Sequence, residues 1–248
     1  MTDRTPADTV EVHPDPDALV TAAAARFVEI VTAAQAARGS ASVVLTGGGT
    51  GIGMLEQVRK APGAVDWSRL DIFWGDERFV PVADAERNEL QAREALLDHV
   101  PVDPARVHPV AASDGEYPDP TEAAAEYSAA VHAHLAEHGS FDLHLLGMGG
   151  EGHVNSLFPD TDAVREAHEL VVAVVNSPKP PPVRVTLTLP AVRRSRHVML
   201  IVGGSAKAEA VAAAIGGAKP VDIPAAGAQG TESTLWLLDQ EAAAQLRR

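Results

Sequence analysis

Apolar positions along the chain follow two alternating periods. Residues 15–39 repeat apolar side chains at helical spacing, begin with an aspartate suited to capping and end at Gly39. Residues 41–46, "ASVVLT", then form a short β-branched run typical of a buried strand. This order of helix and strand recurs along the chain, which indicates βαβ units.

The repeated pattern predicts an α/β fold, a three-layer α/β/α Rossmann-like sandwich with a mostly parallel sheet. Residues 183–189 alternate apolar and polar side chains, and no clear helix separates them from 196–202, so this pair is predicted to form a small antiparallel portion. Further strands are expected at 70–74, 106–110 (weaker), 141–146, 169–175 and 234–238, and further helices near 88–98, 121–138, 205–215 and the Ala-rich C-terminus.

The chain carries neither an internal repeat nor a linker that would divide it. Its 248 residues suit one large domain, so we expect a single domain over 1–248 with residues 1–10 as a flexible N-terminus. The Pro-rich stretch 176–182 is short and is expected to be a rigid loop.

Composition narrows the possible partners and chemistry. Lys and Arg number 20 against 34 Asp and Glu, a net charge of −14, which argues against binding to nucleic acid or an anionic membrane. The absence of cysteine excludes disulfides, thiol nucleophiles and thiolate metal sites. The N-terminus has no apolar signal segment, and the apolar run 198–202 is too short to span a bilayer. We therefore expect a cytoplasmic protein.

Unusual segments follow several predicted strands, where open α/β sheets bind their ligands. They are "TGGGTGIG" at 46–53, "GDERFVP" at 75–81, "GMGGEGH" at 147–153 and "GGSAK" at 203–207. The first joins a strand to a helix start and suits a phosphate, because free amides and the helix dipole face an anion there. It matches neither the dinucleotide nor the P-loop pattern.

The charged residues of these segments allow a functional and an ordinary interpretation. Arg78, Lys179, Arg184 and Lys207 either form a distributed anion site or are solvated surface charges. Asp76 either accepts hydrogen bonds from a sugar or belongs to a surface ion-pair turn. His153 is either a loop residue or a general base that the surrounding glycines allow a substrate to approach.

Other catalytic patterns are missing from the sequence. "GGSAK" ends in lysine where a nucleophile elbow needs glycine, and there is no H-E-x-x-H. His134 and His138 are spaced i, i+4 on a predicted amphipathic helix, where we expect exposed histidines. Without a third ligand in view, we predict no metal site.

Together the segments resemble the glucosamine-6-phosphate isomerase/6-phosphogluconolactonase family, and its lactonase members in particular. "VVLTGGGT", "WGDERFVP", "LLGMGGEGHVNSLFP", "PKPPPVRVTLT" and "VGGSAK" occur in the family's order, over roughly residues 10–245. The most specific part is the glycine–histidine segment followed by "SLFP".

The resemblance implies hydrolysis of 6-phospho-D-glucono-1,5-lactone, a small phosphorylated substrate, by a monomer or homodimer without a cofactor. His153 matches the family's catalytic histidine, and Asp76 would orient the sugar or the base. The residues implied to bind the phosphate and sugar are Thr46, Gly47, Gly48, Gly49, Arg78, Gly149, Arg184 and Lys207. Glu151, Asn88 and Lys179 are expected to support these residues without binding the substrate directly.

Two other functions remain open at this point. The first is a sugar-phosphate isomerase or deaminase, whose relatives usually carry an Asn-Glu pair soon after the Gly-His segment; "NSLFPDT" has no glutamate there. The second is a non-enzymatic sugar-phosphate sensor, against which the retention of His153 speaks. The sequence departs from the family at Glu151, where aspartate is usual, and glutamate reaches one methylene further.

Overall fold

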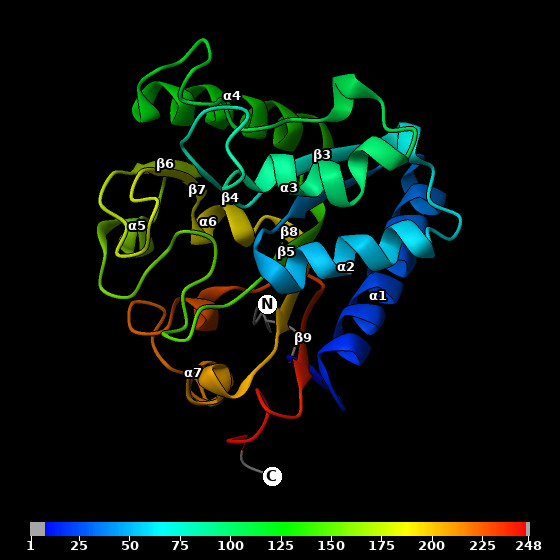
Figure 1. The fold of residues 1–248 in the computed structure, drawn as a ribbon, viewed down its shortest axis with the longest axis vertical. Coiled ribbons are helices and arrows are strands. Elements are labelled where there is room, and N and C mark those ends of the chain that lie inside the picture. Colours follow the sequence, from blue (N-terminus) through cyan, green and yellow to red (C-terminus); the bar gives the residue numbers. More distant parts are fainter. Residues whose placement is uncertain (1–7, 247–248) are drawn as a thin grey trace, which may run out of the picture.

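Six strands form the larger sheet of the computed structural model, which describes residues 8–246. They are β1 (Thr9–His13), β2 (Ala41–Leu45), β3 (Leu70–Trp74), β5 (Phe141–Leu146), β8 (Ser195–Val202) and β9 (Ser233–Asp239). Their order across the sheet is β1-β9-β8-β5-β2-β3, and every neighbouring pair is parallel. The prediction of a mostly parallel sheet is therefore confirmed (Figure 1).

A second, antiparallel sheet holds β4 (Asp76–Arg78), β7 (Arg184–Leu187) and β6 (Val171–Val174) in that order. The antiparallel portion was predicted, but the pairing of 183–189 with 196–202 is wrong. The apolar residues of β8 are buried on both faces, which suits the middle of the parallel sheet. Gly75 connects the two sheets: its N–H donates to the Leu45 carbonyl at 2.9 Å, and its carbonyl accepts from Leu187 at 2.8 Å.

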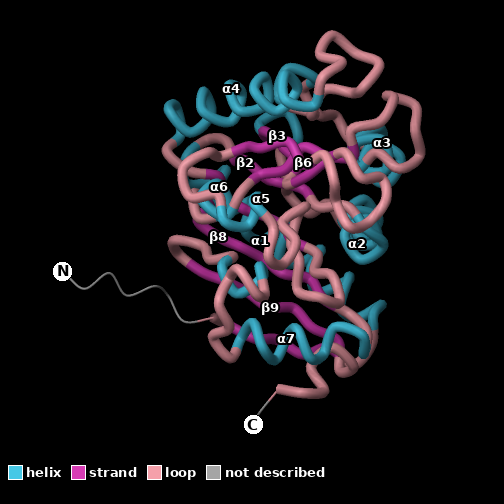
Figure 2. The backbone as a smooth tube through the Cα atoms, turned by 90° about the vertical axis from the view of Figure 1, so that its left-hand side faces the viewer, coloured by secondary structure: helices cyan, strands magenta, loops and turns pink. Residues whose placement is uncertain are grey.

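Helices cover both faces of the large sheet, as the sequence predicts (Figure 2). On one face α1, α2 and α3 share a core with it; on the other, α7 packs over β8 and β9, while α4 and the small sheet pack over β2, β3 and β5. The bounds are α1 (Pro16–Arg38), α2 (Gly48–Lys60), α3 (Asn88–Ala95), α4 (Pro120–His138), α5 (Asp162–Arg165), α6 (Leu189–Val192) and α7 (Ala208–Ile215).

Local signals explain where several elements begin and end. The Asp15 carboxylate accepts the Ala18 N–H at 2.8 Å and caps α1, which ends at Gly39 with a φ of +82°. The predicted C-terminal helix is wrong: residues 240–245 form turns, because so short an Ala-rich segment gains little from helix propensity alone. The predicted strand at 106–110 makes one isolated bridge, from Val107 to Ile72, and a proline lacking an N–H follows soon after.

Two other expectations need correction. Thr9 and Val10 lie in β1, paired with β9, so the segment expected to be flexible does not include them; residues 1–7 lie outside the described residues. On α4, His138 is exposed as predicted, but His134 is only 8% exposed. None of the helices in the described part of the chain has the length and apolar character that crossing a membrane demands.

Candidate active site

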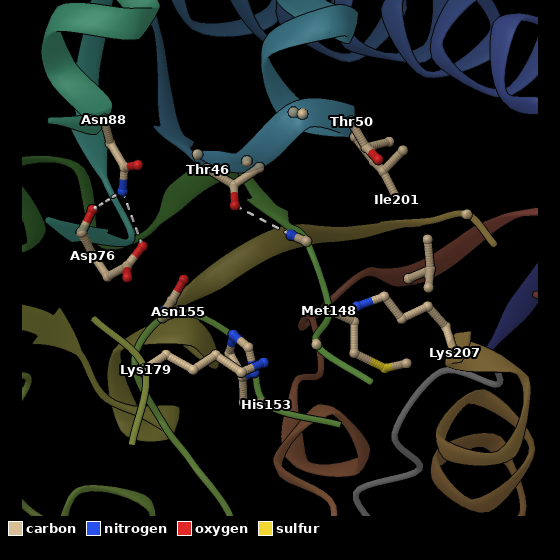
Figure 3. A pocket seen from close by; sticks show the side chains of 18 of the residues that line it. Thr46, Thr50, Asp76, Asn88, Met148, His153, Asn155, Lys179, Ile201 and Lys207 are labelled. Carbon is tan, nitrogen blue, oxygen red and sulfur yellow. Dashed lines mark hydrogen bonds between the residues drawn. The ribbon is translucent and has the colours of Figure 1, made fainter. Parts of the chain in front are cut away.

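The carboxyl ends of β2, β3, β5 and β8 open onto one cavity of about 270 Å³. All of the predicted site residues except Glu151 line this cavity (Figure 3). They are Thr46, Gly47, Gly48, Gly49, Asp76, Arg78, Asn88, Gly149, His153, Lys179, Arg184 and Lys207. His153 and the scattered cations therefore share one edge of the sheet.

The glycine loop at 46–49 leads directly into α2. Gly47 is the N-cap and has no side chain to accept from the first-turn amides of α2. Such amides, with the positive end of the helix dipole, are suited to an anion. A Cβ atom at position 47 would overlap the side-chain oxygen of Asn88, so glycine there also lets Asn88 approach the loop.

His153 lies against the glycine-rich segment that precedes it. Its ring stacks on Phe158, with the centroids 4.4 Å apart, and its side chain is 18% exposed. A Cβ atom at position 149 would overlap the Nδ1 and Cε1 atoms of His153. Gly149 is therefore needed for the imidazole to occupy its place at the cavity wall.

Glu151 stands behind the imidazole and links it to Lys179. Its Oε1 atom lies 3.2 Å from His153 Nδ1 and 2.8 Å from Lys179 Nζ. The Nδ1 atom has no hydrogen-bond partner of good geometry among the described residues. Contacts of this kind in a binding cavity often tighten only when a ligand binds.

The charge states of His153 and Glu151 follow from this arrangement. Burial lowers the pKa of His153, and the Lys179 charge lowers it further, although the Glu151 carboxylate opposes both effects. Burial alone would raise the pKa of Glu151, but its hydrogen bonds with Lys179 and with its own backbone N–H, together with the Lys179 charge, bring that pKa down to about 2. Near pH 7 the imidazole is neutral and Glu151 is ionised.

Asp76 is buried in the cavity wall and is held by its neighbours. Its Oδ2 atom accepts from the Ser156 hydroxyl at 2.6 Å, and the Asn88 amide donates to its backbone carbonyl at 2.8 Å. The Arg184 guanidinium lies 3.7 Å from the same Oδ2 atom. These contacts fix the direction of the carboxylate.

Glu77 lies in the protein interior next to Asp76 and fixes the backbone of the same part of the cavity wall. It is fully buried, and its carboxylate accepts the backbone N–H groups of Arg78, Asn88 and Glu89 at 2.7–2.9 Å. Burial raises the pKa of Glu77 to about 7, against the opposing effects of the Arg87 charge and these amides. By capping the start of α3, Glu77 positions both Arg78 and Asn88.

Arg184 uses most of its donors within the protein. Its guanidinium donates to the backbone carbonyls of Lys179, Pro180 and Pro181 at 2.9–3.2 Å and to the Ser156 hydroxyl at 3.3 Å. Arg184 therefore fixes the 179–181 loop, and with it the Lys179 side chain, in addition to lining the cavity.

Lys207 and Arg78 are more available to a ligand. Lys207 forms no ion pair with any residue between 8 and 246, and burial and the Lys179 charge lower the pKa of its ammonium. Arg78 donates through Nη1 to the Glu86 carbonyl at 2.8 Å and to Asn88 Oδ1, while its buried Nε atom has no partner in the described structure. An anion in the cavity would compensate both groups.

Several lining residues were not singled out in the sequence. Asn155 is the clearest: it has a φ of +49°, and its side-chain oxygen is buried without a partner among the described residues. Asparagine tolerates this conformation better than most residues, but only the folded loop shows where its amide lies. The others are Thr50, Gly51, Gly147, Met148, Ile201, Val202 and Gly203.

Comparisons with known proteins show the family of the chain. The family model described as "Glucosamine-6-phosphate isomerases/6-phosphogluconolactonase" matches residues 14–236. The 6-phosphogluconolactonase of Mycobacterium tuberculosis is 56% identical, with 96% of this chain and 98% of the relative covered; that of Streptomyces coelicolor is 53% identical, with 96% and 94% covered. The solved 6-phosphogluconolactonase from Trypanosoma cruzi superposes with a TM-score of 0.84 at 26% identity, covering 100% of both chains. The chain belongs to the glucosamine-6-phosphate isomerase/6-phosphogluconolactonase family.

Proposed function

We propose that this chain is a 6-phosphogluconolactonase, a carboxylic ester hydrolase that opens 6-phospho-D-glucono-1,5-lactone in the oxidative pentose phosphate pathway. The names of its relatives at 53–56% identity support this activity. The observation that carries it is a neutral, partly exposed imidazole in the same cavity as several cations and an uncapped helix start.

In the proposed reaction His153 is the general base. Its Nε2 atom takes a proton from water as the water oxygen attacks the lactone carbonyl carbon. The tetrahedral intermediate then collapses, the bond from that carbon to the ring oxygen breaks, and the imidazolium returns its proton to the ring oxygen. The products are a free hydroxyl and a carboxylic acid that ionises in solution. One water is consumed, and no cofactor is required.

In this proposal the cations bind different parts of the substrate. Lys207, Arg78 and the first-turn amides of α2 bind the phosphate dianion, since charge-assisted hydrogen bonds are the strong ones. Arg184 keeps Lys179 in place and offers its remaining N–H to the sugar. Asp76 and Asn155 accept hydrogen bonds from the sugar hydroxyls.

The wider proposals are that the chain works as one domain, in the cytoplasm, as a monomer or homodimer, and that it binds neither nucleic acid nor membranes. Both sheets contribute to one cavity, which supports a single catalytic unit. A net charge of −14 disfavours association with polyanions.

The test is acid release from freshly prepared 6-phosphogluconolactone, followed in a pH-stat with the spontaneous rate subtracted. We expect His153→Ala to lower kcat by about 100-fold or more, because general-base catalysis contributes on that scale. Calorimetric binding of the product 6-phosphogluconate should be retained, since the cations remain.

His132→Ala is the matched control, because His132 is an exposed histidine on α4 whose ring contacts the Ser128 carbonyl of the same helix. Near-wild-type turnover of His153→Ala would exclude His153 as the base. Equal rates on the unphosphorylated lactone would contradict the phosphate site, and ammonia release from glucosamine 6-phosphate would favour a deaminase instead.

A further inference from the structure

A cluster of residues that could bind a metal ion lies at the opposite end of the large sheet's strands from the cavity that contains His153. Asp71 is near the amino end of β3, and His134 and His138 lie one turn apart in the last turns of α4. One ligand atom from each of the three lies within 4.8 Å of the others. A small cavity of about 120 Å³ is lined by all three.

The burial of His134 differs from the exposed position that the sequence predicted for it. It is 8% exposed, and its Nε2 atom is buried without a hydrogen-bond partner among the described residues. Its ring stacks on Phe141 at 5.1 Å between centroids, and its centroid lies 4.6 Å from that of His138. Burial and the neighbouring His138 lower the pKa of His134 to about 4.

We propose that Asp71, His134 and His138 bind one divalent transition-metal ion, with Zn²⁺ the best match. Two imidazoles and a carboxylate, with water completing four-coordination, form a typical donor set for zinc, whereas Mg²⁺ prefers oxygen ligands. The chain has no cysteine, so tight binding of such an ion must use nitrogen and oxygen ligands. Ligand atoms around a tetrahedral zinc ion lie roughly 3.3 Å apart. Donors up to 4.8 Å apart therefore need to close in by up to about 1.5 Å, and the exposed side chain of His138 leaves room for this.

The charged groups around the cluster are compatible with an ion there. Arg106 donates to Asp71 Oδ2 at 2.6 Å, and His108 Nε2 lies 3.4 Å from Oδ1. Each carboxylate oxygen of Asp71 therefore already has one partner and keeps a further lone pair for an ion, while these contacts fix the direction of the carboxylate. Arg38, which also lines the cavity, is paired with Asp142. A bound ion would tie the end of α4 to β3.

The test uses protein without a polyhistidine tag, stripped with a chelator and titrated with Zn²⁺ in a calorimeter. We expect one equivalent per chain, a visible d–d spectrum of four-coordinate Co²⁺, and no binding of Mg²⁺. His138→Ala should weaken Zn²⁺ binding by at least about tenfold, since even residues behind a metal ligand have effects of that size. Asp71→Asn is a second variant that removes the anionic ligand.

His132→Ala is again the matched control, because it removes an exposed histidine from the same helix without touching the cluster. Zinc should raise the melting temperature of the wild type and of His132→Ala, but not that of His138→Ala. Lactone hydrolysis reports that each variant is folded, since the cluster is remote from that cavity. Equal zinc binding by His138→Ala and the wild type, or no stoichiometric binding by the wild type, would overturn the proposal.

Discussion

Glu151 is the residue that controls the basicity of His153. Its carboxylate is the main influence that raises the histidine pKa against burial and the Lys179 charge. Replacing it with a neutral amide leaves the Lys179 ammonium without its partner beside the imidazole. The imidazolium then becomes less favourable, so the histidine pKa must fall.

We therefore predict that Glu151→Gln shifts the acid limb of the kcat–pH profile to lower pH and also lowers the plateau, because a weaker base is a poorer catalyst. The measurement is kcat over roughly pH 5 to 8, around the histidine pKa. The kcat profile reports the enzyme–substrate complex and so avoids titration of the free substrate phosphate. The exposed Glu29→Gln on α1 is the control. An acid limb that stays in place would show that Glu151 acts only structurally.

His153 could be predicted as a candidate general base from its residue type, but the groups around it are visible only in the folded structure. The glycines at 147–152 indicated a close approach, and the structure shows that the group approaching Gly149 is the histidine ring itself. Asn155 and Ser156 were not predicted, because a polar side chain in an irregular loop has no periodicity that reveals its direction. Their roles depend on backbone angles that the sequence does not specify.

At the scale of elements, the start of β7 and the 3-10 helix at Ser205–Lys207 present cations in different ways. Arg184 is 5% exposed and satisfies three loop carbonyls. Lys207 is half-buried and unpaired within residues 8–246. The two cations line one cavity, yet only Arg184 is built into the structure around it.

This contrast predicts that Arg184→Ala and Lys207→Ala both raise KM by about tenfold or more, because each removes charge-assisted hydrogen bonds to an anionic substrate. Only Arg184→Ala should also lower the free energy of unfolding, by about 2–4 kcal/mol, since it leaves the loop carbonyls without a donor and Asp76 without its positively charged neighbour. Steady-state kinetics and urea unfolding measure the two effects. A similar loss of stability in Lys207→Ala, or an unchanged KM in either variant, would contradict this division.

The sequence predicted most elements but not all of their partners. Long helices and apolar strands have clear periods, and the rule for parallel sheets places their carboxyl ends together. β4 has three residues, too few for a period, and its pairing with β7 depends on how Gly75 connects the two sheets. The sequence therefore indicated an antiparallel portion of the fold, but it did not indicate which strands pair there or in which register.

At the scale of the whole molecule, the two edges of the large sheet carry different chemistry. The carboxyl edge concentrates cations around His153 in a chain whose net charge is −14. The amino edge holds the Asp71 cluster against α4. Between them lies His144, in the middle of β5, where no solvent reaches its ring.

His144 links the stability of the whole fold to pH. Its Nδ1 atom lies 3.4 Å from the Ser195 hydroxyl, and its Nε2 atom is buried without a partner among the described residues. Burial lowers the pKa of His144 to about 3, and the neighbouring Asn155 side chain opposes this effect only in part. The unfolded chain takes up this proton near pH 6.5 and the folded chain does not, so stability is highest above pH 6.5 and falls as pH decreases toward 3.

We predict that His144→Gln makes the free energy of unfolding less dependent on pH between about 6 and 4, by up to about 1.4 kcal/mol per pH unit. His134 changes stability in the same direction and Glu77, whose pKa is raised, in the opposite one, so the wild-type slope alone does not isolate His144. The difference in slope between the wild type and His144→Gln isolates the effect of His144, because the other titrating groups are common to both proteins. Urea unfolding at several pH values measures it, and parallel slopes would mean that His144 is protonated in the folded protein.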